Sequence, residues 1–478
     1  MENDLKMDDE KVRDGDMDHI SDDVDDWYEV DDDDYDDVNN IDESFDEDDL
    51  RNGIQGLDEL TVNGQADGKT VIEDQEEESE LKLIQKSEFR YAKSRQRIPS
   101  EKIATSLGQF FNLIRSAIGK ELWRVTMPIH FNEPLSLMQR ICEDLEYAYL
   151  LNQAAGLIII TYLLKECKDS MRRLALVTAF AVSPFSTTIG RYSKPFNPLL
   201  GETFELIDDN LDYCCFCEQV SHHPPILAMY CEGRTWKLWQ EYKFDSKFRG
   251  QFLRLSPTGD VHVKFKDNQH HYSWNRPDTI VHNLLIGSMW VDQDGIAKIT
   301  NHQTQEISLM VYDSWNKAGR SYKNVKCKVR DAKDKIKFEL NGAWDSYLDC
   351  TSVSDMKTER LWTIGERPAT STRMYGFTRF AMKLNQLQEG VCPTDSRCRP
   401  DQRLMEEGKI LEASKEKHRL EEKQRAVRRY RANEKIEYKP RWFVMKKDPD
   451  TNEYYHMYAG GYWKARLDGN FIDIPEIF

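Results

Sequence analysis

Two adjacent histidines followed by two prolines form the most distinctive group of chemically active residues, within the segment EQVSHHPPI at positions 218–226. A proline pushes the residue before it out of the helical region, so His222 and His223 should lie in an extended segment at the end of a strand. Adjacent side chains on a strand point in opposite directions, and no third ligand stands at a zinc-like spacing nearby. We therefore expect no metal at this pair.

Catalysis by the histidine pair would require a nucleophile or a carboxylate partner, and the sequence shows no triad signature. We therefore expect no catalytic residues. Two imidazoles can instead donate hydrogen bonds to a phosphate without any further group. The closest cluster among the ten cysteines, Cys214, Cys215 and Cys217, is interpreted as buried free thiols in a reducing compartment.

The negative charge of the chain is concentrated at its N-terminus. The first 50 residues contain 25 acidic and 3 basic residues, whereas the remaining 428 contain 59 acidic and 63 basic residues. Residues 1–95 carry too few periodic apolar side chains to offset the entropy of folding, so we expect a disordered acidic tail. Its start lacks the apolar stretch of a signal peptide, which predicts a cytoplasmic protein. Outside the tail the basic residues exceed the acidic ones only slightly, too little to indicate a nucleic-acid-binding protein.

The elements that must position the histidines follow from hydrophobic periodicity. Apolar residues recur with helical spacing over Leu137–Thr178 and with a period of two over about Phe204–Leu348. Many short strands separated by turns predict an antiparallel sheet that curls into a sandwich or barrel. A highly charged helix should cover Met405 to about Lys439, with most of its charges in solvent. The longest apolar run, Ala154–Leu164, has 11 residues and is too short to span a bilayer.

A short amphipathic helix is predicted to precede these elements. Its apolar residues follow helical spacing, and Gly119 can end it. From the residues alone, the helix is either ordinary core or a movable cover over an apolar cavity. Its apolar positions are Leu107, Phe110, Phe111, Ile114 and Ile118.

Several segments together resemble the oxysterol-binding protein-related family. EQVSHHPP resembles the fingerprint of that family, and MPIHFNEPLSLMQR, KPFNPLLGETFEL, RLEEKQRAVRR and the closing YKPRWF, YAGGYW and IPEIF occur in the family's order. The resemblance implies that residues 96–478 form one lipid-binding domain of the α+β class, made mainly of β structure. Its centre would be a large incomplete antiparallel β-barrel that encloses a lipid tunnel. An N-terminal lid would close the tunnel, with helical segments before the barrel and on its C-terminal side.

The resemblance also implies a binding site for the headgroup of phosphatidylinositol 4-phosphate. The two histidines, the Lys and Asn of the KPFNP motif and three residues of the charged helix would form it. The cations would supply charge-assisted hydrogen bonds to the phosphate, and the glutamate would accept from inositol hydroxyls. The three helix residues stand at i, i+4 and i+8, so they share one face. The seven residues are Lys194, Asn197, His222, His223, Lys417, Glu421 and Arg425.

The family to which the chain is similar transfers lipids and has no enzymatic activity in this domain. Its lid, which matches Leu107–Ile118, covers the tunnel mouth and seals a sterol or an acyl chain. We therefore expect a protein without cofactors that carries a sterol, phosphatidylinositol 4-phosphate or both between cytosolic membrane surfaces. A lipid sensor or scaffold without bulk transport is the alternative, whereas an esterase or phosphatase would need a nucleophile motif.

Two features depart from the usual family pattern. The segment GLIIITYLLK, Gly156–Lys165, looks like an insertion that lengthens a helix, binds a membrane or reflects a retained intron. The sequence upstream shows no pleckstrin-homology or ankyrin region, so the chain resembles the compact animal members.

The acidic tail contains DWYEVDD, Asp26–Asp32, which resembles an FFAT motif. Such motifs dock onto VAMP-associated proteins of the endoplasmic reticulum, where the acidic flank steers binding and the aromatic residues anchor it. Docking would place the chain peripherally at endoplasmic-reticulum contact sites. A solvated acidic tail with isolated aromatics is the alternative, since Trp27 replaces the usual Phe or Tyr. The matching residues are Asp26, Trp27, Tyr28, Glu29, Val30 and Asp32.

Overall fold

The computed structural model of the chain describes residues 79–102, 128–156, 169–210, 212–248, 252–267, 269–284, 289–313 and 323–478. The FFAT-like residues 26–32, the predicted lid at 107–118 and positions 157–165 of the insertion lie outside the described residues. No helix within the described ranges is long and apolar enough to cross a membrane.

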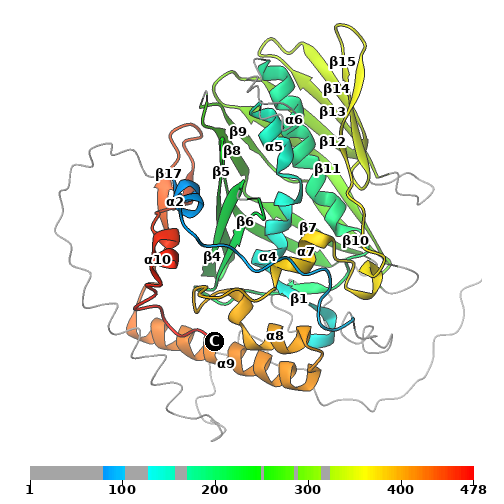
Figure 1. Cartoon of the computed structure of the whole chain (residues 1–478). Coiled ribbons are helices and arrows are strands. Elements are labelled where there is room, and N and C mark those ends of the chain that lie inside the picture. The colour runs from blue at the N-terminus through cyan, green and yellow to red at the C-terminus, as the bar shows by residue number, and fades with distance from the viewer. Residues whose placement is uncertain are drawn as a thin grey trace, which may run out of the picture. The chain divides into compact units, whose positions relative to one another are not determined.

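One antiparallel sheet of 14 strands dominates these residues (Figure 1). The strands run in the order β16-β15-β14-β13-β12-β11-β10-β7-β6-β5-β4-β3, and β8 and β9 form a second connection between β6 and β11. Within the described residues the end strands β3 and β16 do not pair with each other, so the expected incomplete barrel is confirmed. The strands are β3 (Thr203–Ile207), β4 (Tyr213–His222), β5 (Pro225–Gly233), β6 (Trp236–Phe248), β7 (Phe252–Thr258), β8 (Val261–Phe265), β9 (His271–Trp274), β10 (Asp278–His282), β11 (Trp290–Asn301), β12 (Ile307–Asp313), β13 (Asn324–Arg330), β14 (Ile336–Ala343), β15 (Tyr347–Ser352) and β16 (Thr358–Thr363).

The alternation of apolar and polar residues is confirmed in strands that have one solvent face. In β13, Val325, Cys327 and Val329 are buried, and the lysines between them are exposed. The buried side of β13 is covered by helix α6 (Ser170–Val182). A period of two therefore separates core from solvent here, as the sequence pattern predicts.

Strand β4 lies between two apolar cores and ends at His222. Cys215 and Cys217 on one face belong to the larger core, whereas Cys214 and Phe216 on the other face belong to a smaller core beside the C-terminal segment. All four side chains are at most 1% exposed. Because the strand is packed on both faces, its carboxyl end with the histidine pair has a fixed position.

Two helices pack over the sheet in Figure 1, α5 (Tyr149–Ala154) and α6. The Asp169 side chain caps α6 by accepting from the Met171 amide, and 11 of the 13 helix residues are buried. The helix is therefore enclosed by the protein on most sides, and it packs against β12, β13 and β14. Four short elements precede these helices in the chain: η1 (Ile129–Phe131), β1 (Asn132–Ser136), α4 (Leu137–Cys142) and η2 (Glu143–Tyr147). Two follow them: η3 (Ser183–Thr188) and β2 (Lys194–Phe196).

The charged helix predicted over Met405 to about Lys439 is present but shorter, because a break at Gly408 separates it from the helix before it. Helix α8 (Pro400–Glu406) ends before Gly408, whose φ of +81° favours glycine, and α9 (Ile410–Glu434) begins after it. Only Ala413 and Leu420 of α9 are buried, so its charges lie largely in solvent, as predicted. The other C-terminal elements are η4 (Ser371–Arg373), α7 (Arg379–Leu384), η5 (Ser396–Cys398), β17 (Phe443–Lys447), β18 (Tyr454–Tyr458) and α10 (Tyr462–Asp468).

Residues 79–95 belong to the folded unit, which corrects the predicted boundary of the disordered tail. Helix α2 (Glu80–Lys86) buries Leu81 and Ile84 in the smaller core, together with Trp442 and other C-terminal residues. The Ser79 side chain caps the helix and donates to Glu232 at 2.7 Å. The surrounding acidic residues obscure this short apolar pair in the sequence, and its packing partner lies near the opposite end of the chain.

Candidate anion-binding site

Strand β2 and the loop after it carry two of the predicted site residues, Lys194 and Asn197. β2 pairs in parallel with β1, and the Asn132 amide donates to the Lys194 carbonyl at 3.1 Å. Burial and then the charge of Lys417 lower the pKa of Lys194 to about 8, although Glu421 opposes the shift. Lys194 is therefore charged at neutral pH but gives up its proton more readily than an exposed lysine.

A buried ion-pair network holds this loop in place. Arg399 donates to the Asn197 carbonyl at 2.8 Å, to Glu202 at 3.0 Å and to Asp401 at 2.7 Å. Its guanidinium also stacks over the Phe196 ring. The backbone of Asn197 is thus positioned by interactions that do not depend on a ligand, as preorganised binding requires.

The histidine pair lies where β4 ends, which confirms its predicted position. The His222 and His223 rings meet edge to face, with centroids 4.9 Å apart. His222 is half-buried and His223 is exposed. Burial and then the neighbouring His223 lower the pKa of His222 to about 4, so the His222 ring is neutral at physiological pH. A neutral imidazole offers one donor and one acceptor.

Helix α9 meets the histidines through two residues that the sequence analysis did not select. The Gln424 side-chain nitrogen lies 2.7 Å from His222 Nε2, and the Gln424 oxygen accepts from the Leu200 amide at 3.0 Å. Arg428 Nη1 lies 2.7 Å from His223 Nε2. Gln424 therefore ties the loop after β2 to the end of β4.

The three predicted residues of α9 make different contacts. Lys417 Nζ bonds Glu421 at 2.6 Å, and the charges of both act on Lys194. Arg425 pairs instead with Glu422. The structure thus brings Lys194, Lys417 and Glu421 together, whereas no contact of the described residues joins Arg425 to either histidine.

Positions along α9 relate the missed residues to the predicted ones. Gln424 and Arg428 follow Glu421 at spacings of three and seven residues, so they extend along an adjoining strip of the same helix. That spacing is visible in the sequence, but the face of α9 that meets the histidines is not. The role of all these residues in binding an anion stays a prediction.

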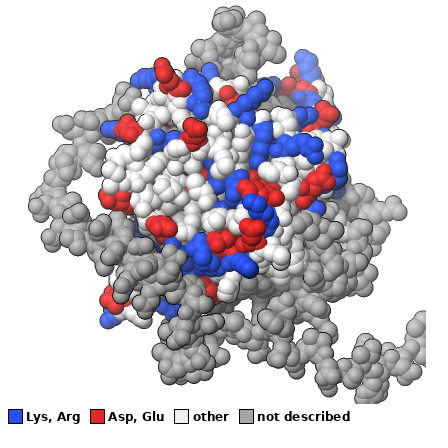
Figure 2. Space-filling model, turned by 60° about the horizontal axis from the view of Figure 1, so that its bottom comes forward, with Lys and Arg blue, Asp and Glu red and all other residues white. Residues whose placement is uncertain are grey.

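The face of the molecule along which α9 runs carries mixed charges (Figure 2). Lys417, Arg419 and Arg425 each form an ion pair with a glutamate of the same helix. The pairs of Arg419 and Arg425 are partly exposed and contribute little to stability, and all three pairs balance the positive charge locally. These ion pairs therefore hold the three cations in defined positions.

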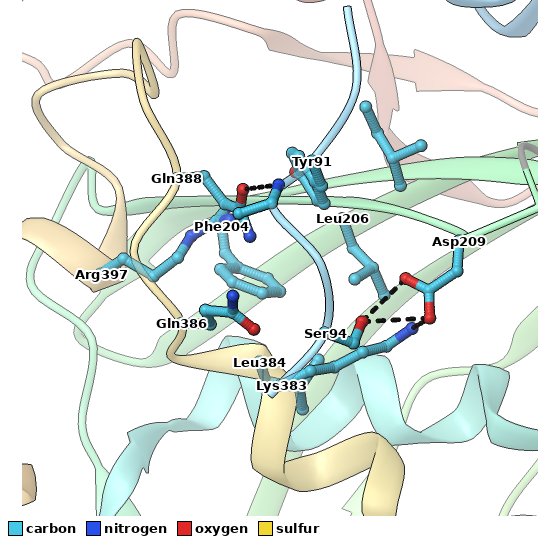
Figure 3. Close-up of a pocket in the computed structure, with 12 residues that line it drawn as sticks. Tyr91, Ser94, Phe204, Leu206, Asp209, Lys383, Leu384, Gln386, Gln388 and Arg397 are labelled. Atoms are coloured by element: carbon cyan, nitrogen blue, oxygen red, sulfur yellow. Dashed lines mark hydrogen bonds and ion pairs between the residues drawn. The ribbon is translucent and has the colours of Figure 1, made fainter. Parts of the chain in front are cut away.

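An irregular strap, residues 87–98, crosses a small pocket away from this site (Figure 3). The Ala92 amide donates to the Gln388 side chain at 2.8 Å. Ser94 donates to Asp209 at 3.0 Å, and Lys383 lies 3.2 Å from the same carboxylate. The strap therefore fixes the chain just before the predicted lid. The pocket is lined by Tyr91, Ala92, Ser94, Phe204, Leu206, Ile207, Asp209, Lys383, Leu384, Gln386, Gln388 and Arg397.

One group of potential metal ligands lies where the turn between β17 and β18 meets β9. His271, Asp448 and Asp450 have ligand atoms within 4.8 Å of one another. However, His271 Nδ1 bonds Asp450 at 3.0 Å, His271 Nε2 bonds His262 at 3.0 Å, and Lys264 lies 3.3 Å from Asp450. These hydrogen bonds and the ion pair occupy the ligand atoms of His271 and Asp450 and join the turn to the sheet.

A second group consists of three cysteines in the larger core. Cys142 Sγ lies 3.9 Å from that of Cys215 and 3.6 Å from that of Cys217. Burial raises the pKa of all three thiols well above the ordinary value. All three lie in the larger apolar core, consistent with the buried free thiols expected from the sequence.

Comparisons with known proteins point to one family. The family model described as oxysterol-binding protein matches residues 109–467. The chain is 40% identical to oxysterol-binding protein 2 of Mus musculus over 81% of this chain and 44% of the mouse protein. It is 35% identical to oxysterol-binding protein-related protein 2B of Arabidopsis thaliana over 88% of this chain and 61% of the plant protein. The chain thus spans about half the length of these relatives.

Solved structures share the fold. The Osh1 ORD domain in complex with cholesterol matches with a TM-score of 0.75 and 36% identity, over 81% of this chain and 95% of that domain. The Osh3 ORD in complex with PI(4)P from Saccharomyces cerevisiae matches with a TM-score of 0.68 and 29% identity, over 81% of this chain and 99% of that domain. The mainly β fold expected from the sequence is confirmed by these matches.

Proposed function

Because the chain belongs to the oxysterol-binding protein family, we propose that it binds a sterol and phosphatidylinositol 4-phosphate and carries them between membrane surfaces. The observation that supports this most is the meeting of β2, the end of β4 and α9. It gathers two imidazoles, a half-buried lysine and further cationic donors from segments far apart in the sequence. A phosphorylated inositol headgroup needs such donors.

The solved relatives support both ligands. The Osh3 domain was crystallised with PI(4)P and the Osh1 domain with cholesterol. In this chain, Lys194, Lys417, Glu421, His222 and His223 would surround the headgroup. The apolar interior of the incomplete barrel would receive the acyl chains or the sterol beneath the predicted lid.

We propose a carrier without catalytic activity. In the described residues His222 contacts Gln424 and His223 contacts Arg428, and neither of these partners is a nucleophile or a carboxylate. Hydrolysis by an imidazole requires such a partner. No cofactor is needed to bind and release a lipid.

Docking to a VAMP-associated protein through Asp26–Asp32 remains part of the proposal. It would place the chain at the endoplasmic reticulum and its contact sites. A fluorescent peptide spanning Asp22–Asp37 tests it. Binding to the receptor domain supports the proposal, and no binding at about 100 μM, the weak end of peptide affinities, contradicts it.

Transfer between liposomes distinguishes a carrier from a sensor. Donor vesicles containing labelled sterol or labelled phosphatidylinositol 4-phosphate are mixed with acceptor vesicles and a small amount of the full chain. A carrier moves many lipids per protein molecule, whereas a sensor stops after one. Mass spectrometry of lipids that co-purify with the chain identifies the neutral ligand.

A further inference from the structure

Arg428 on α9 contacts the exposed member of the histidine pair. Its Nη1 lies 2.7 Å from His223 Nε2, and both side chains are exposed. A guanidinium carries only hydrogen-bond donors, so His223 Nε2 must act as the acceptor. This contact stands at the surface, where a headgroup arriving from a membrane would first meet the site.

The pairing of Arg428 differs from that of several other cations on α9. Lys417, Arg419 and Arg425 each bond a glutamate of the helix. No carboxylate of the described residues lies within ion-pair distance of Arg428, whose contact is with a ring nitrogen. Its charge is therefore less neutralised by protein groups and is available to an anion.

Nε2 of His222, like Nε2 of His223, acts as a hydrogen-bond acceptor. The Gln424 oxygen is occupied by the Leu200 amide, so its nitrogen is the group that donates to His222 Nε2. Gln424 and Arg428 stand four residues apart, on one side of α9. Both imidazoles thus accept from α9 at the nitrogens where a phosphate, which is itself an acceptor, would require donors.

We propose that Arg428 is a further headgroup-contacting residue, whose guanidinium turns from His223 to the phosphate of the bound lipid. This inference rests on the proposed function. A dianionic phosphate cannot bond an imidazole nitrogen that is acting as an acceptor. A phosphate near His223 instead lies within reach of the remaining N–H groups of Arg428, which can form paired bonds to two phosphate oxygens.

Neighbouring arginines of α9 supply a matched test. The full chain and its Arg428→Gln, Arg428→Lys and Arg429→Gln variants are titrated calorimetrically with dioctanoyl phosphatidylinositol 4-phosphate and with dioctanoyl phosphatidylinositol. We expect Arg428→Gln to weaken binding of the phosphorylated lipid about tenfold and to leave binding of the unphosphorylated lipid unchanged. Arg428→Lys should lose less, because it keeps the charge. Arg429 is also exposed, and Arg429→Gln should stay within about twofold of the unmodified chain.

The controls separate this inference from the function it rests on. Thermal unfolding of each variant verifies that the fold is retained, and both exposed substitutions should leave it unchanged. If His222→Ala/His223→Ala abolishes binding and Arg428→Gln does not weaken it, Arg428 is not a headgroup contact and the proposed function stands. If the unmodified chain does not bind the phosphorylated lipid, both proposals are overturned.

Discussion

Gln424 donates its side-chain N–H to His222 Nε2 over 2.7 Å, while its carbonyl oxygen accepts from the Leu200 amide. The second contact fixes the orientation of the amide, so the first fixes the tautomer of the imidazole. The proton of the neutral His222 ring must then reside on Nδ1. One glutamine of a highly charged helix therefore sets the protonation pattern of a histidine about 200 positions earlier.

We predict that His222 remains neutral to about pH 4, because burial lowers its pKa to that value. An unfolded histidine takes up its proton at about pH 6.5, so this group makes the free energy of unfolding fall as the pH drops from about 6.5 toward 4. Nitrogen-15 NMR of the side chain measures both properties. A His222 ring that titrates near pH 6.5, or that carries its proton on Nε2, contradicts the assignment.

Phosphoinositide binding should weaken above about pH 8, where Lys194 begins to lose its proton. A bound phosphate raises the pKa of this lysine, so binding above pH 8 takes up a proton and affinity falls by up to about tenfold per pH unit. Lys194→Arg should move this loss to higher pH, because arginine stays charged. Calorimetry between pH 7 and 10 measures the effect. Lys415→Arg at an exposed position of α9 should leave the profile unchanged, and an identical profile for Lys194→Arg rules out Lys194 as the titrating group.

Glu218 should make stability depend on pH around neutrality. It accepts from the Arg441 amide at 2.9 Å and the Trp442 amide at 3.0 Å, yet burial raises its pKa to about 7. Because the folded pKa lies above the unfolded one, the free energy of unfolding should fall as the pH rises from about 4.5 to 7. Glu218→Gln should remove this dependence and cost about 1–3 kcal/mol, since an amide N–H replaces one acceptor.

Denaturant unfolding between pH 4.5 and 8 measures the contribution of Glu218. Glu416→Gln is the control, because Glu416 lies on α9 in a partly exposed ion pair that contributes little to stability. If Glu218→Gln has the stability and the pH profile of the unmodified chain, the buried carboxylate does not anchor the segment after α9.

Helix α2 should contribute to stability, although it lies in the part assigned to the acidic tail from the sequence. Ile84 is fully buried and Leu81 is 2% exposed, so Ile84→Ala should lower the free energy of unfolding by about 2–5 kcal/mol. Lys82 on the same helix is exposed, and Lys82→Ala should change it by about 0.5 kcal/mol or less. Equal stabilities for the two variants would show that α2 does not pack on the body in solution.

Local patterns predicted the sheet well because alternation decides which face of a strand is buried. The lysines of β13 between Val325, Cys327 and Val329 are an example. The fork in the sheet was not predictable, because β6 pairs through Trp236–Gln240 with β8 and through Lys243–Phe248 with β7. A change of partner within one strand leaves no periodic signal.

The candidate site was predicted in its residue types but not in its contacts. The family resemblance identified the histidine pair and Lys194, and the structure places them beside α9. Gln424 and Arg428 were missed because α9 is charged on most of its surface, with only Ala413 and Leu420 buried. Hydrophobic periodicity therefore cannot indicate which side of that helix meets the histidines.

Extraction of labelled phosphatidylinositol 4-phosphate from liposomes, compared between the unmodified chain and His222→Ala/His223→Ala, tests the central claim most directly. The account predicts that the unmodified chain extracts the lipid and that the double variant loses on the order of 100-fold in affinity, about tenfold for each imidazole that positions a donor of α9. Extraction of labelled sterol should continue in both. Equal extraction of the phosphoinositide by the two proteins would contradict the headgroup site described here.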